Sequence, residues 1–60
     1  MDDETKIKMD LLRERLGNSF LSLLSQTKAG LMKKTAYPND VTVKQAIDDL
    51  YERVEKYGRG

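Results

Sequence analysis

The chain contains no cysteine and no histidine among its 60 residues. These absences remove the thiol nucleophile, the commonest general base and the commonest zinc ligands, and they exclude disulfide bonds. The one adjacent acidic pair outside the N-terminus is Asp48 and Asp49, and neighbours on a helix diverge by about 100°, which argues against a shared metal ion. We therefore expect no enzymatic activity, no metal or cofactor site and no small-molecule substrate.

Long apolar runs are also missing. The longest apolar cluster, residues 20–24, is interrupted by Ser22 and is far shorter than the about 20 residues that span a bilayer. The chain begins with the acidic residues Asp2, Asp3 and Glu4 after Met1, whereas a signal peptide begins with basic residues and continues into an apolar segment. The sequence predicts neither a membrane partner nor secretion by a signal peptide.

Charge of neither sign predominates. Eleven basic residues face ten acidic ones, which gives a net charge of +1. The only local basic bias lies in residues 18–41, which hold Lys28, Lys33 and Lys34 against Asp40. Three lysines without an arginine cluster are typical of a solvated helix end, so nucleic acid is not the expected partner.

The clearest pattern that is present is a capped helix over residues 43–57. Thr42 and Gln45 have the spacing of a capping box, in which each side chain bonds the backbone amide of the other residue. Gly58 follows as a left-handed stop. Apolar residues within the helix recur at alternating spacings of four and three, a narrow seam typical of a coiled coil: Val43, Ile47, Leu50, Val54 and Tyr57.

A longer helical stretch is predicted over residues 3–34, which contain no proline. Its side chains follow an eleven-residue repeat that keeps one face continuous: Met9, Leu12, Leu16, Phe20, Leu23, Thr27 and Leu31. Two interpretations stay open. In the preferred one the helix is continuous and bent at Gly17, because a mid-helix glycine costs only about 1 kcal/mol. In the other it ends at Gly17 and a second helix begins at Asn18 or Ser19, both good N-caps.

Residues 35–42 form the link between the two predicted helices. Pro38 disfavours helix at Tyr37, and the two residues after Pro38 favour a turn. A link of this length reverses the chain, so we predict an all-α fold, a helical hairpin that forms one small domain over residues 1–60. In this hairpin Leu50 and Val54 are expected to pack back on Leu16, Leu23 and Leu24.

A single domain of this length buries only about 60% of its unfolded surface when it folds alone. We therefore expect it to form a homo-oligomer or to join a larger protein assembly. The side chains predicted to form the protein interface are the apolar ones of both helices: Leu16, Phe20, Leu23, Leu24, Leu31, Met32, Ile47, Leu50, Val54 and Tyr57.

Residues 41–54 resemble a capped-helix segment of bacteriophage fibre and other virion proteins, of the form x-Thr-Val-x-x-Ala-[Ile/Leu]-Asp-x-Leu. In those proteins the segment lies at a neck or junction, often in a trimer. The resemblance implies a cytoplasmic or virion-associated structural or adaptor protein that acts through helix packing. The alternative is a small regulator or inhibitor that docks its 20–32 face on a host protein or on a nucleic-acid-binding complex.

Overall fold

A computed structural model describes residues 3–57, and all regular structure within them is helical. Helix α1 spans Asp3–Leu16, α2 spans Phe20–Lys34 and α3 spans Val43–Tyr57. Two 3₁₀ turns complete the order: η1 over Gly17–Ser19, between α1 and α2, and η2 over Pro38–Asp40, between α2 and α3. The predicted all-α helical hairpin is confirmed, whereas the predicted stop at Gly58 lies outside the described residues.

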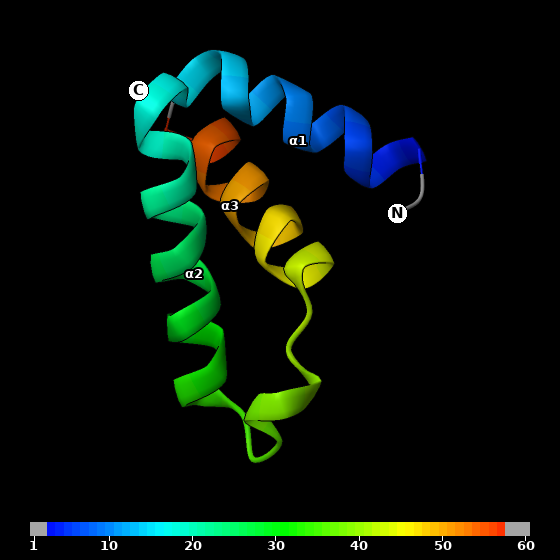
Figure 1. Ribbon diagram of the computed structural model, residues 1–60, viewed down its shortest axis with the longest axis vertical. Coiled ribbons are helices and arrows are strands. Elements are labelled where there is room, and N and C mark those ends of the chain that lie inside the picture. The colour runs from blue at the N-terminus through cyan, green and yellow to red at the C-terminus, as the bar shows by residue number, and fades with distance from the viewer. Residues whose placement is uncertain (1–2, 58–60) are drawn as a thin grey trace.

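Helices α1 and α2 are arranged around α3 (Figure 1). Helix α2 runs away from α1 after the first turn, and the chain then reverses so that α3 returns antiparallel to α2. Helix α3 packs against both α1 and α2, while α1 and α2 meet mainly at the turn that joins them. The C-terminal helix is therefore the element that the rest of the fold covers.

The N-terminal stretch changes direction at Gly17. Its φ of +56° lies in the left-handed region, which costs residues other than glycine about 1–2 kcal/mol. The structure has the bend at Gly17 that the preferred interpretation contains. The three-residue turn η1 separates α1 from α2 there, and no side chain caps the start of α2, in contrast to the N-cap of the other interpretation. A straight helix over residues 3–34 would be about 48 Å long, about twice the length of α3, so half of its apolar face would have no cover. The bend brings both halves onto α3.

The link reverses the chain as predicted. Thr35 ends α2 in an extended conformation, and Tyr37 is non-helical before Pro38. Pro38 then opens η2, where the Asp40 amide donates to the Tyr37 carbonyl at 3.0 Å and the Val41 amide donates to the Pro38 carbonyl at 3.2 Å. The link is thus a short hydrogen-bonded turn that delivers the chain to the start of α3.

The start of α3 contains both bonds of the capping box. The Thr42 amide donates to Gln45 Oε1 at 2.8 Å, and the Gln45 amide donates to Thr42 Oγ1 at 3.2 Å. The Ala46 amide donates to the Thr42 carbonyl at 3.2 Å, the first bond of the helix. Two amides that a helix start leaves without an intrahelical partner are therefore satisfied by side chains within four residues.

The core is small and draws on all three helices. Its buried members come from each side of the Gly17 turn and from α3: Leu12, Phe20, Ile47 and Leu50. Partly buried side chains surround them, namely Met9, Leu16, Leu23, Leu24, Tyr51 and Val54, so the predicted packing of α3 on residues 16–24 is present. Thr27 is buried too, and its hydroxyl donates to the Leu23 carbonyl at 2.8 Å.

The predicted seam of α3 is buried only at its centre. Ile47 and Leu50 are buried, but Val43 is 43% exposed. Tyr57, predicted as the last residue of the seam, is 74% exposed within the single chain. Val43 and Tyr57 are the first and last residues of α3, where a side chain has neighbours on one side only.

Candidate interaction surface

Most residues of the predicted protein interface lie inside a single chain. Phe20, Ile47 and Leu50 are buried. Four others pack against them: Leu16, Leu23, Leu24 and Val54. Leu31 is half-buried, and only Met32 and Tyr57 are exposed. The apolar faces that the sequence offered for contacts between chains are thus used mainly for the hairpin itself.

A second face of α2, with two apolar side chains among its four residues, is largely exposed. Leu21, Ser25, Lys28 and Met32 recur at spacings of four, three and four, and we call them the outer face of α2. Leu21 is 73% exposed, although it sits beside the buried Phe20 in the sequence. The list of interface residues predicted from the sequence included Met32 but not Leu21, although Leu21 lies in the 20–32 face. The available signal was that α2 is apolar on more than the one face that α3 covers.

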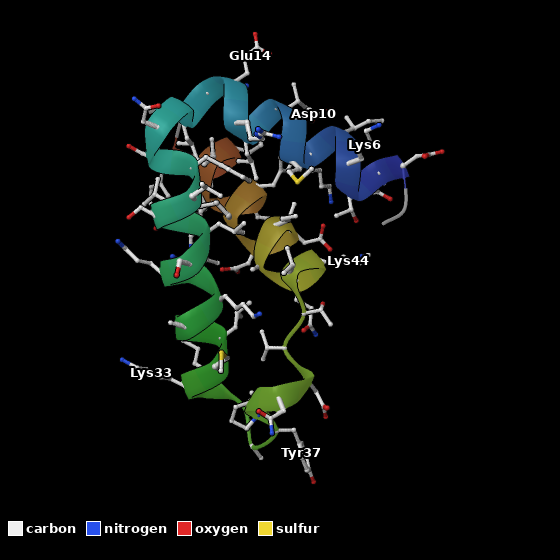
Figure 2. The ribbon with its side chains drawn as sticks, viewed as in Figure 1. Lys6, Asp10, Glu14, Lys33, Tyr37 and Lys44 are labelled. Atoms are coloured by element: carbon white, nitrogen blue, oxygen red, sulfur yellow. The ribbon has the colours of Figure 1, made fainter. Side chains whose placement is uncertain are left out.

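The charged residues of α2 itself all have one sign. No acidic residue occurs between Glu14 and Asp40, whereas α2 carries Lys28, Lys33 and Lys34. Lys33 extends from the end of α2 away from the helices, and Asp10 and Glu14 point outward from α1 (Figure 2). Carboxylates at the edge of a partner's contact surface would therefore favour its packing on the outer face of α2.

Two ion pairs join α1 to α3. Lys8 Nζ lies 3.4 Å from Asp48 Oδ1, and Arg15 Nη1 lies 3.1 Å from Glu55 Oε1. The offset along the chain is 40 residues in both pairs, so the two helices run in the same direction. Partly exposed pairs of this kind stabilise little on their own, but they define which turn of α1 faces which turn of α3.

Lys8 and Asp48 are the centre of a small charged cluster. Lys8 Nζ also lies 3.4 Å from Glu4 Oε1 and 5.5 Å from the centre of the Tyr51 ring, and Lys44 Nζ lies 3.0 Å from Asp48 Oδ2. The Lys44 hydrogen bond is the largest influence on Asp48, and together with Lys8 it lowers the pKa of that carboxyl despite desolvation. Desolvation opposes the charged form of Lys8, but Asp48 and Glu4 outweigh it and raise the pKa of Lys8.

These shifts predict how pH acts on the α1–α3 contact. Because the pKa of Asp48 is below its ordinary value of 3.8, the Asp48 pairs stabilise the fold at neutral pH, and this contribution is lost as the pH falls through the folded-state pKa. The raised pKa of Lys8 gives a contribution that persists up to its ordinary value of 10.5 and is lost only at higher pH.

NMR titration of the Asp48 carboxyl should show its pKa rising more in Lys44→Gln than in Lys8→Gln. The reverse order would contradict the assignment of Lys44 as the main partner.

A groove opens beside α3, at the end of α2 and along the link. It has a volume of about 480 Å³, and Leu31 and Val41 supply apolar lining. Its acidic lining includes Asp48 and Asp49, but both already have basic partners, Lys44 for the first and Arg53 at 3.5 Å for the second. Across the described part of the chain no cluster of acidic side chains could hold a metal ion.

None of the helices within residues 3–57 is long and apolar enough to cross a membrane. No protein-family model, no curated protein and no solved structure matches the chain.

Proposed function

We propose that this chain is a non-enzymatic structural or adaptor protein that acts through helix packing. The outer face of α2 is the surface by which it packs on another protein chain. The likeness of residues 41–54 to virion neck segments supports a place in a phage particle or in its assembly.

The observation that carries the proposal is the exposed apolar surface on α2. Leu21 is 73% exposed and Met32, on the same outer face, is 36% exposed. The exposed Leu21 lies on the one helix without acidic residues, so the uncovered surface has both apolar and electrostatic character.

Leu21→Glu tests this assignment. The side chain is 73% exposed, so the substitution should change the free energy of unfolding by no more than about 0.5 kcal/mol. It should nevertheless weaken self-association, or stoichiometric co-purification with an assembly, because it places a carboxylate in the contact. Light scattering over a wide range of protein concentrations measures the first effect.

Ile7→Glu is the matched control, because Ile7 is 59% exposed but lies on α1. If the two variants associate alike, the outer face of α2 is not the contact.

The acid-free stretch that contains α2 favours one alternative function, a small regulator that docks this face on an acidic surface of a soluble target. Such a regulator stays monomeric at all concentrations and captures a single target. Leu21→Glu then abolishes capture, while Ile7→Glu does not.

A further inference from the structure

The turn at Gly17 separates two apolar half-helices that belong to one continuous pattern. The eleven-residue repeat passes through the turn without a change of phase, and each of its members in α1 and α2 is at least partly buried. A straight helix over residues 3–34 would keep all of them on one face. The sequence is thus compatible with both a bent and a straight N-terminal stretch.

Few local interactions hold the bend at Gly17. Leu16, Ser19 and Phe20 already have right-handed helical φ and ψ values. No side chain caps the start of η1 or of α2, in contrast to the two capping bonds at α3. Gly17, with its φ of +56°, is the one described residue with a positive φ. Conversion of Gly17 to a helical φ is the main change that a straight helix requires.

Straightening would move α1 away from its own α3. The buried Leu12 of α1 would then lose its contact with α3, and α3 would lose the part of its cover that α1 provides. Since α1 contacts α2 mainly at the turn, the α2–α3 hairpin would remain packed. The α1 helix of a second copy fits the uncovered face of α3 in every contact, because it is the same helix.

We propose that α1 is exchanged between two copies of this chain, through a straightened Gly17, to give a dimer built on two continuous helices over residues 3–34. Each long helix packs its α2 half on its own α3 and its α1 half on the α3 of the other copy. Exchange of an identical element creates no new type of contact, which makes it a low-cost route to a dimer. The inference rests on the proposed function in that the chain acts through helix packing, but it names a second copy as the partner and the α1–α3 contact, not the outer face of α2, as the interface.

Gly17→Ala tests the role of the turn. A Cβ at Gly17 would meet no atom within 4 Å, so the effect is one of backbone conformation. Alanine disfavours the left-handed turn and favours the helix, which together shift the closed-to-straight equilibrium about 30-fold per chain (about 2 kcal/mol at about 1.4 kcal/mol per tenfold). After unfolding and refolding at high protein concentration, light scattering should show more dimer for Gly17→Ala than for the parent.

Gly30→Ala is the matched control. Gly30 lies inside α2, and a Cβ there also meets nothing within 4 Å, but its φ is not positive. This variant stabilises a helix without acting on the turn, so its dimer content should equal that of the parent. An equal rise in Gly30→Ala, or no rise in Gly17→Ala, overturns the proposal.

The two ion pairs identify which α1 packs on which α3. One chain carries Lys8→Glu and Arg15→Glu, and the other carries Asp48→Lys and Glu55→Arg, so each alone has like charges between its own α1 and α3. Exchange between the two chains restores opposite charges at both α1–α3 pairs. Co-refolded mixtures should therefore contain about a tenfold excess of heterodimer over the statistical ratio, measured by native mass spectrometry.

The outcomes separate this inference from the proposed function. A heterodimer excess that persists with Leu21→Glu in both chains supports α1 exchange. Statistical mixing in dimers that Leu21→Glu dissociates overturns the exchange and supports the outer face of α2 as the contact. Chains that remain monomeric throughout, with Gly17→Ala included, overturn the exchange and also remove self-association from the proposed function.

Discussion

Leu50→Ala should lower the free energy of unfolding by about 2–5 kcal/mol. Leu50 is 4% exposed and belongs to the buried core that joins α3 to the other helices. Its truncation removes buried methyl groups and leaves a cavity that a small, three-helix core cannot easily collapse. A domain of this size has a total stability of roughly 3–9 kcal/mol, so a large part of the molecules should be unfolded near physiological temperature.

Thermal melts at a fixed protein concentration measure this loss, with Leu21→Ala as the control. Leu21 has the same chemistry but is 73% exposed, so its truncation should change stability by no more than about 0.5 kcal/mol. If Leu50→Ala melts like the parent, Leu50 is not in a packed core, and the claim that α3 organises the fold is wrong.

Thr42→Ala should cost about 0.5–2 kcal/mol. The substitution removes the acceptor that lies 3.2 Å from the Gln45 amide, and that amide then depends on solvent. The Gln45 side chain can still accept from the amide of residue 42, so half of the capping box survives. The loss should therefore be smaller than that of Leu50→Ala.

Thr42→Ser retains the hydroxyl and should be nearly silent in the same melts. The expected order of destabilisation is Leu50→Ala, then Thr42→Ala, then Thr42→Ser. Equal melting of the alanine and serine variants at position 42 would mean that the hydroxyl bond does not hold the start of α3.

The parts of the fold that could be predicted are those set by residues close together in the sequence. The α3 cap is such a feature, because Thr42 and Gln45 satisfy each other within four residues. The link is another, since Pro38 restricts the residue before it through sterics alone. The hairpin follows from these two features and the apolar repeats.

The direction of the chain at Gly17 could not be predicted in the same way. Glycine costs about 1 kcal/mol within a helix and nothing in a left-handed turn, so local preference separates the two conformations only slightly. The deciding factor is the burial of Leu12 and Phe20 against α3, a contact between residues far apart in the sequence. The relative position of α1 is therefore a property of the tertiary structure.

The candidate interaction surface was predictable only in part for a related reason. An apolar face such as that of Ile47 and Leu50 reads the same in the sequence whether it is covered by its own chain or by another. The structure places both side chains inside the chain and leaves Leu21 exposed. The apolar residues that remain exposed for a partner can be identified only when it is known which ones the hairpin buries within the chain.

The common direction of α1 and α3 also determines how the molecule would respond to tension. The chain enters through the start of α1 and leaves through the end of α3, which lie at opposite ends of their shared interface. A force applied between these points pulls the two helices past each other lengthwise, and it loads the pairs Lys8–Asp48 and Arg15–Glu55 at the same time. Under such shear, all contacts along the α1–α3 interface must break together. The α2–α3 hairpin, pulled at its open end, would instead separate one turn after another.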